Sequence, residues 1–296
     1  MIRKLAIGFV ALTMLTALAI GGLAAAWLAG IRVPVASGTT YMQIQKLAGA
    51  DAAGAPTNMF FIALVGSDFR PGVGGARGDA LHLVGVNPAT HIATMLNVPR
   101  DTCWQGDKIN AAHARGGPRG MADALGGMVG VPVSYVVSVD FAGFQGIVDG
   151  MGGVQMNVPM PMDDEFSGAV FAPGDQRLNG AQALAFSRNR HDFPNSDITR
   201  TGNQGHLILS ALAQLQREAT GPVGEFKVAA LLGRHAQIDG MGLTDVYRLG
   251  RVAQQLNPAA ARSITIPTGG GGCMSLAGDA RGLFADFADD ATLQAH

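Results

Sequence analysis

Charged residues and cysteines are scarce in this 296-residue chain, and both shortages exclude classes of function. Only 15% of the residues are charged, and 21 basic against 22 acidic side chains leave a net charge of −1. A general nucleic-acid binder needs clustered surplus Lys and Arg, and a disordered chain combines high net charge with low hydrophobicity, so neither class fits. The two cysteines, Cys103 and Cys273, are too few and too far apart for a CxxC redox pair or a zinc site made of cysteines.

Several common catalytic signatures are also absent. The sequence has no GxSxG, HExxH or GxxxxGK[ST] motif, and its seven histidines include no pair at metal-ligand spacing. Lysine is rare as well, because 17 of the 21 basic residues are arginine. A GC-rich genome produces the same bias, but arginine is also the side chain that binds phosphate through two parallel hydrogen bonds. The positions of the arginines therefore matter more than their number.

A long segment without charge, residues 5–31, follows the basic residues Arg3 and Lys4. It exceeds the roughly 20 residues that a helix needs to cross a bilayer, which favours an uncleaved anchor with residues 1–4 in the cytoplasm. The alternative is a cleavable signal peptide that ends in small residues such as the three alanines at 24–26. Both interpretations export the rest of the chain, where cysteines can be oxidised.

The remainder predicts a single α/β domain at residues 57–290, between a stalk at 32–56 and a short tail at 291–296. The stalk has an apolar pattern around residues 42–47 that we interpret as one helix. Apolar runs and turn residues predict strands at 59–65, 80–86, 91–98, 133–139, 154–158 and 263–267. Apolar periodicity predicts helices at 141–151, 180–187, 203–219, 225–233, 244–256 and 280–288. Strands and helices alternate without a long polar linker, which favours one domain over two.

The two cysteines follow two of these strands. Cys103 comes soon after the strand at 91–98, and Cys273 soon after the last strand. If these strands end at the same edge of the sheet, the two loops meet, and we predict a disulfide between them. The alternative is two unrelated small core residues.

Arginine and aspartate residues stand at the ends of the predicted strands. The first group is Asp68 and Arg70, Arg77 and Asp79, Arg100 and Asp101, followed by Lys108 and Asn110; the second is Arg188, Arg190, Asp197, Arg200 and Gln204. Ligand sites of open α/β sheets gather at strand ends, so these side chains predict a site for phosphate and Mg²⁺, with carboxylates as metal ligands. The alternative is surface salt bridges, each contributing about 0–1 kcal/mol. Arg188 and Arg190 would share a face in a strand and diverge by about 200° in a helix.

Eight short motifs follow one another along the exported part of the chain. They are LVGSDFR (64–70), RGD (77–79), NVPRDT (97–102), KINAAHARGG (108–117), VSVDFAGF (137–144), VDGMGGV (148–154), LNGAQALAFSRNR (178–190) and DITRTGNQ (197–204). In order and approximate spacing they resemble the LytR-CpsA-Psr family. The resemblance implies an α/β/α sandwich with a central mixed β-sheet, on the outer side of a bacterial cell membrane and held there by the N-terminal anchor. It also implies partners: a polyprenyl phosphate or pyrophosphate-linked glycan and a peptidoglycan acceptor.

The resemblance also assigns roles to the charged residues. It implies Asp68 and Asp79 as ligands of Mg²⁺, and Arg77, Arg100, Arg188 and Arg190, together with Asp79, as catalytic groups. It implies substrate binding by Asp68, Arg70, Lys108, Asn110, Asp197, Arg200 and Gln204, although Lys108 and Asn110 fit loop architecture equally well. The chain departs from the family at Asn203-Gln204-Gly205, where the family usually reads RQQ, and this departure affects the outer phosphate contacts.

The implied reaction is attack by a sugar hydroxyl on the glycan-side phosphorus of a lipid-linked pyrophosphate, with Asp79 or Asp101 as candidate bases. Phe141, Phe144, Ile147, Val148 and the leucines of 207–215 are either a surface for the lipid tail or ordinary core. Two other functions use the same residues. One is a pyrophosphatase with water as the nucleophile, and the other is a non-catalytic protein that binds the lipid carrier.

Overall fold

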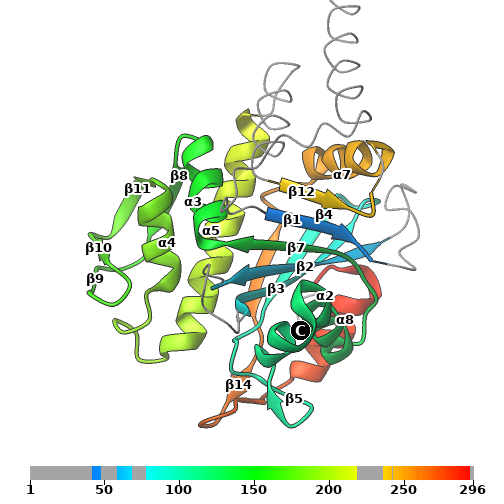
Figure 1. The fold of residues 1–296 in the computed structure, drawn as a ribbon, viewed down its shortest axis with the longest axis horizontal. Coiled ribbons are helices and arrows are strands. Elements are labelled where there is room, and N and C mark those ends of the chain that lie inside the picture. The colour runs from blue at the N-terminus through cyan, green and yellow to red at the C-terminus, as the bar shows by residue number, and fades with distance from the viewer. Residues whose placement is uncertain (1–41, 48–58, 69–77, 219–235, 242, 294–296) are drawn as a thin grey trace, which may run out of the picture.

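The computed structural model describes residues 42–47, 59–68, 78–218, 236–241 and 243–293 (Figure 1). The expected anchor at 5–31, the expected helix at 225–233, and Arg70 and Arg77 lie outside these residues. Within the described ranges, no helix combines the length and the apolar character that crossing a membrane requires.

A seven-stranded mixed sheet forms the centre of the fold, in the order β12-β1-β7-β2-β3-β4-β13. Its strands are β1 (Met42–Lys46), β2 (Phe60–Ser67), β3 (Gly78–Asn87), β4 (Ile92–Asn97), β7 (Val133–Asp140), β12 (Ala236–Asp239) and β13 (Arg262–Thr265). β2 is antiparallel to β3 and parallel to β7, and β4 is antiparallel to β3 and parallel to β13. As a result, β2, β4, β7 and β13 all end at one edge of the sheet, where β3 begins. We call it the site edge.

Helices cover both faces of the sheet, which confirms the α/β/α arrangement for the described part of the chain (Figure 1). On one face, α2 (Ala111–Val129) and α8 (Ala280–Asp290) pack on β2 and β3, with Leu81, Leu83, Met121, Leu125 and Phe287 fully buried between them. On the other face lie α3 (Phe141–Gly150), α4 (Gly180–Arg188), α5 (Ser196–Glu218) and α7 (Leu243–Gln255). Burying apolar side chains on both faces explains why β2 reads as a continuous apolar run.

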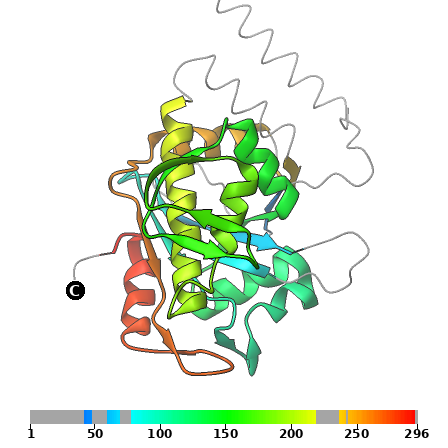
Figure 2. The same ribbon diagram turned by 90° about the vertical axis from the view of Figure 1, so that its left-hand side faces the viewer.

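Four short two-stranded hairpins lie outside the central sheet. β8 (Val154–Val158) pairs with β11 (Gly174–Leu178), and β9 (Met162–Asp164) pairs with β10 (Ala169–Phe171). These two hairpins share a second apolar core with α3, α4 and α5, and Figure 2 shows them in front of α5. The other two are β5 (Cys103–Trp104) with β6 (Asp107–Lys108), and β14 (Thr268–Gly269) with β15 (Ser275–Leu276).

Several elements differ from the sequence-based expectation, among them β12 of the central sheet, where no strand was expected. The helix expected around residues 42–47 is wrong, because these residues form β1, which hydrogen-bonds between β7 and β12. The sheet therefore includes residues that we assigned to the stalk. The expectation also omitted α2, a helix of 19 residues that carries Pro118 and is kinked at Gly117, where φ is 61°.

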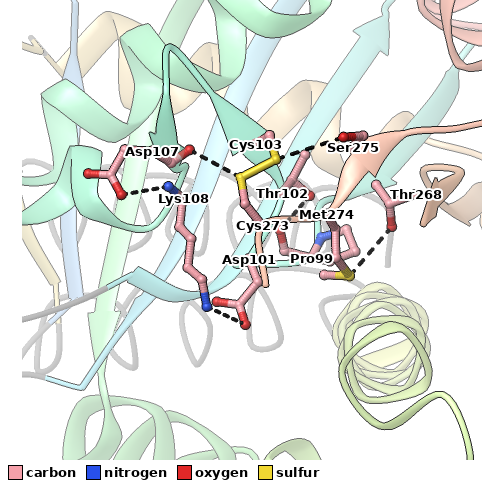
Figure 3. Close-up of a disulfide and its surroundings, with 10 residues drawn as sticks. All are labelled: Pro99, Asp101, Thr102, Cys103, Asp107, Lys108, Thr268, Cys273, Met274 and Ser275. Atoms are coloured by element: carbon pink, nitrogen blue, oxygen red, sulfur yellow. Dashed lines mark hydrogen bonds and ion pairs between the residues drawn. A yellow bond between two sulfur atoms is a disulfide. The ribbon is translucent and has the colours of Figure 1, made fainter. Parts of the chain in front are cut away.

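The predicted disulfide between Cys103 and Cys273 is present in the structure, with 5.2 Å between the Cα atoms (Figure 3). Its basis is the one expected, because β4 and β13 are parallel neighbours that end together at the site edge. The two loops also pair through their backbones: Cys103 N donates to Met274 O at 2.7 Å, and Met274 N donates to Asp101 O at 2.8 Å. The disulfide therefore joins loops that hydrogen bonds already hold side by side.

Candidate functional site

A cavity of about 510 Å³ opens at the site edge, between the sheet and helices α3, α4 and α5. We call it the site cavity. Its lining has a charged and polar part made by Asp68, Asp79, His82, Arg100, Asp140, Asp164, Ser167, Ser187, Arg188, Arg190, His191, Arg200 and Gln204. The apolar part includes Leu64, Val137, Val139, Phe141, Phe144, Phe166, Leu184, Leu207 and Ile208. A ligand that fills this cavity must therefore carry both a polar and an apolar part.

Four charged side chains from three elements form one network beside the cavity. Arg100 follows β4, and its Nη1 lies 2.6 Å from Oδ1 of Asp79 at the start of β3. Arg200 belongs to the first turns of α5, and its Nη2 lies 2.6 Å from Oδ1 of Asp197. The Nε of Arg100 lies 3.8 Å from the same Asp197 oxygen, which links the two pairs. The fold therefore brings Asp79, Arg100, Asp197 and Arg200 together, as we expected from the sequence.

The two arginines of this network differ in their electrostatic surroundings. Burial alone would lower the pKa of Arg100, but the hydrogen bond and charge of Asp79 and the charge of Asp197 raise it. Arg200 is only 5% exposed, and this burial, together with the positive charges of Arg100 and Arg190, lowers its pKa. Both Nε–H groups are buried, and neither has a hydrogen-bond acceptor among the described residues. The network thus keeps unused donors beside the cavity.

Arg188 and Arg190 both line the cavity, but in neither of the two conformations that we considered. α4 ends at Arg188, and the chain becomes extended at Asn189, with φ −60° and ψ 130°. The Arg188 guanidinium lies over the ring of Phe141, with Cζ 5.2 Å from the ring centroid. Gln204 of α5 also lines the cavity. Its Nε2 donates to Ser187 O at 2.9 Å, and this hydrogen bond connects α5 to α4.

Three candidate residues lie away from the cavity lining, in the loop that bears the disulfide. Lys108 forms an ion pair with Asp101, with 3.1 Å between Nζ and Oδ2, and Figure 3 shows this pair together with the disulfide. Asn110 is 9% exposed, precedes α2, and its backbone N donates to Arg100 O at 3.2 Å. In this structure Lys108, Asn110 and Asp101 hold the loop after β4 together.

A chain of hydrogen-bonded polar side chains begins at His82, which lines the cavity, and it was not expected from the sequence. His82 of β3 is 1% exposed, and its Nδ1 lies 2.8 Å from Asn97 Oδ1. Asn97 Nδ2 in turn donates to Ser263 Oγ at 2.8 Å, so Asn97 Oδ1 is the acceptor and His82 Nδ1 the donor. Burial lowers the pKa of His82 to about 4, although the Asn97 hydrogen bond opposes the shift, so the ring is neutral at neutral pH.

Gly205 explains part of the departure at Asn203-Gln204-Gly205. A Cβ at position 205 would lie 2.6 Å from Asn97 Oδ1 and 2.7 Å from Asn97 Nδ2, and it would also collide with Ser263 Oγ. Only glycine lets α5 approach the Asn97–Ser263 pair this closely. Asn203 is 8% exposed, and its Nδ2 is buried without an acceptor among the described residues.

A second unexpected group joins Asp164, at the end of β9, to His191 after α4. Asp164 is 2% exposed, and its Oδ1 lies 3.0 Å from His191 Nδ1. The ring of His191 lies against the ring of Phe166, with 4.6 Å between the centroids. No spacing rule links residues 27 positions apart in different elements, so only the fold reveals this contact.

The sequence matches the LytR_cpsA_psr family over residues 34–280. Among curated relatives, the polyisoprenyl-teichoic acid–peptidoglycan teichoic acid transferase TagU of Bacillus licheniformis is 36% identical over 155 residues, 50% of each chain. TagV of Bacillus subtilis, which carries the same transferase name, is 31% identical over 58% of this chain and 48% of its own. The chain therefore spans about half the length of the curated relatives it matches.

Solved structures match over more of the fold. The LytR-Csp2A-Psr enzyme from Actinomyces oris superposes with a TM-score of 0.65 at 25% identity, covering 80% of this chain and 92% of that one. Bacillus subtilis TagV superposes with a TM-score of 0.65 at 21% identity, covering 79% and 97%.

Proposed function

Because the chain belongs to the LytR_cpsA_psr family, we propose that it is a membrane-anchored, extracytoplasmic phosphotransferase. Its substrate would be a polyprenyl-pyrophosphate-linked glycopolymer and its acceptor peptidoglycan, in keeping with the names of the relatives TagU and TagV. The anchor would be residues 5–31. The single observation that carries the proposal is the site cavity, in which an arginine-rich part adjoins an apolar part.

The apolar part suits a polyprenyl chain. Phe141 and Phe144 of α3, Leu184 of α4, and Leu207 and Ile208 of α5 face this space from three helices. Of the residues considered for the lipid, Val148 and Ile147 are not among the residues that line the cavity, and they pack in the core shared by the hairpins. The proposed lipid site therefore includes only some of the apolar residues that we considered from the sequence.

The arginines suit the pyrophosphate. The side chains of Arg188, Arg190, Arg100 and Arg200 all line the cavity. Guanidinium groups bind phosphate oxygens in a forked geometry and stabilise charge that builds up on the leaving group. In this arrangement the four arginines would orient the pyrophosphate and stabilise the departing polyprenyl phosphate.

The carboxylates suit a magnesium ion bound together with substrate. Asp68 and Asp79 both line the cavity, and the described residues include no group of three His, Cys, Asp or Glu side chains able to hold a metal ion. Mg²⁺ is commonly held by one or two carboxylates, with phosphate oxygens and water completing its shell, so this donor set fits. Once bound, the ion would neutralise phosphate charge.

The test is turnover of a synthetic polyprenyl-pyrophosphate-linked oligosaccharide by the full chain with Mg²⁺ and peptidoglycan fragments. Arg188→Ala and Arg190→Ala should each reduce turnover by about 10- to 150-fold, because each removes a charge-assisted contact worth roughly 1.5–3 kcal/mol. Lysine at either position should rescue only in part, since a point charge does not form the fork. Arg119→Ala is the matched control, because Arg119 is exposed on α2, across the sheet from the cavity.

Melting temperatures of the same preparations separate function from folding. If the pair forms only structural contacts, the alanine variants should melt lower and keep wild-type activity per folded molecule. That result would remove Arg188 and Arg190 from the site. Release of glycan phosphate into solution without transfer to the fragments would instead identify a hydrolase that uses water as the nucleophile.

A further inference from the structure

His191 and Asp164 form a pair in the lining of the site cavity, and His191 follows Arg190 in the sequence. Asp164 ends β9, and His191 lies in the loop between α4 and α5, so the pair joins the β9–β10 hairpin to the arginine-bearing loop. Both side chains line the cavity, as do Phe166 and Arg190. A group held at this place is adjacent to the proposed pyrophosphate contacts.

The Asp164 carboxylate is fixed in position by several donors. Oδ1 accepts from His191 Nδ1 at 3.0 Å and from the Phe166 backbone N at 3.0 Å, and Oδ2 accepts from the Arg190 backbone N at 3.4 Å. Burial would raise the pKa of Asp164, but the hydrogen bonds from His191, Ser167, Phe166 and Arg190 lower it to about 2. The carboxylate is therefore ionised under ordinary conditions and can act only as an acceptor.

This acceptor determines which nitrogen of His191 carries the proton. A neutral imidazole has one N–H and one lone pair, and Nδ1 must supply the N–H to the ionised Asp164. The lone pair is then on Nε2. The His191 side chain is 44% exposed, whereas the Asp164 side chain is 1% exposed. The Phe166 ring packs against the imidazole of His191. A base that a third group orients in this way is a recurring arrangement in enzymes that activate hydroxyl nucleophiles.

We propose that His191 is the general base that takes the proton from the attacking hydroxyl, with Asp164 as the residue that positions it. The proposal rests on the proposed phosphotransferase function. The acceptor hydroxyl loses its proton to Nε2, and its oxygen forms the new bond to the glycan-side phosphorus. The bond from that phosphorus to the bridging oxygen breaks, and the electron pair leaves with the polyprenyl phosphate. The proton on His191 then passes to solvent.

The two aspartates considered as bases are less suited to this task. Asp79 lies 2.6 Å from the Arg100 guanidinium, so its negative charge is already compensated. Asp101 pairs with Lys108 and is not among the residues that line the cavity. His191 instead has a carboxylate beside it, which stabilises the imidazolium formed when it accepts a proton.

The charges around His191 belong to both elements that form the pair. Asp163 and Glu165 flank Asp164 in sequence, and Arg190 and Asp192 flank His191. The Asp192 carboxylate is occupied, since its Oδ2 accepts from Asn189 Nδ2 at 2.7 Å and from the Asp163 backbone N at 2.9 Å. Asp164 is thus the carboxylate that contacts the imidazole.

The test compares His191→Ala with wild type in the full chain, using the same synthetic lipid-linked pyrophosphate, Mg²⁺ and peptidoglycan fragments. A lost general base should lower kcat by about 10²- to 10⁴-fold. Added imidazole should restore part of the rate in His191→Ala, which loss of a purely structural side chain would not allow. His206→Ala is the matched control, because His206 is exposed on α5 and does not line the cavity.

The possible results separate this inference from the proposed function. Wild-type turnover with an unaffected His191→Ala, or a slow variant that imidazole does not rescue, would overturn the inference alone. Absence of turnover by the wild type would overturn the proposed function and the inference with it. Nitrogen NMR of the ¹⁵N-labelled imidazole gives a second measurement that needs no variant: a neutral ring protonated on Nδ1 supports the proposal, and one protonated on Nε2 contradicts it.

Discussion

Replacement of Gly205 by alanine is the sharpest structural test of the fold around the cavity. The added Cβ would lie 2.6 Å from Asn97 Oδ1 and 2.7 Å from its Nδ2, closer than side-chain carbons approach polar atoms, and would also collide with Ser263 Oγ. Asn97 is only 1% exposed and Gly205 is itself buried, so the contact can be relieved only by moving α5 or displacing the asparagine. Both responses disturb the hydrogen bonds from His82 to Asn97 and from Asn97 to Ser263.

The cost of this change can be worked from its parts. Overpacking a buried site costs typically about 1–3 kcal/mol, and each of the two hydrogen bonds lost contributes about 1 kcal/mol, while the better helix propensity of alanine offsets about 1 kcal/mol. We therefore expect Gly205→Ala to lower the free energy of unfolding by about 2–4 kcal/mol. For a domain of this size the melting temperature should fall by roughly 5–15 °C.

Calorimetry and urea unfolding of matched variants measure the effect. Gly250→Ala is the control: Gly250 is exposed on α7, nothing lies within 4 Å of an added Cβ, and alanine should be neutral or stabilising by about 0.5–1 kcal/mol. Removing the nearest clash with Ser263→Ala should recover part of the loss in the double variant. A Gly205→Ala protein that melts at or above wild type would refute the close approach of α5 to β4 and β13.

Two further predictions concern stability. Asp164→Asn should destabilise the protein by about 2 kcal/mol near neutral pH, because a folded-state pKa of about 2 against an ordinary 3.8 stabilises the fold above pH 4. This contribution is lost as the pH falls from about 4 to 2, so wild type and variant should converge in acid; a gap in unfolding free energy that does not narrow would contradict the assignment. Replacing both Cys103 and Cys273 by serine should cost about 5 kcal/mol in the chain-entropy view, because the disulfide spans 170 residues. Urea unfolding measures that loss, and thiols that react in unfolded, unreduced wild type would show that the bond is absent.

The central strands could be predicted from the sequence because their signal is local. Residues 59–65 form an apolar run that is typical of a strand buried on both faces, and the structure places β2 there. β1 could not be recognised, because five residues with a mixed pattern carry too little periodicity to separate a strand from a helical turn. Its place in the sheet depends on β7 and β12, which follow it by many residues.

α2 was missed for a different physical reason. Gly116, Gly117 and Pro118 stand within the helix, where each disfavours helical backbone, and the axis is kinked there. The helix forms because Met121 and Leu125 are fully buried against the sheet, and this tertiary packing outweighs the local preference. Local signals therefore predicted no helix where packing produces one.

Some contacts of the candidate site could be predicted from the sequence, and others could not. Asp79 and Arg100 could be predicted as neighbours because strand ends at one edge of a sheet meet. The Asp164–His191 pair could not, because Asp164 ends a three-residue strand of a hairpin outside the central sheet. Its existence depends on how that hairpin packs on α4, which no local pattern encodes.

The strand order implies an order of assembly. β2, β3 and β4 are neighbours joined by short connections within residues 60–97, and β7 completes the centre at residue 140. Such local pairings lose little loop entropy and form early, whereas β13 must return across more than 160 residues to pair with β4. The first half of the described chain can thus build the middle of the sheet while the rest is still emerging, and the Cys103–Cys273 bond can close only after the final segment arrives. Oxidation of the two cysteines would then be a late step, which links the final segment covalently to a central sheet that is already folded.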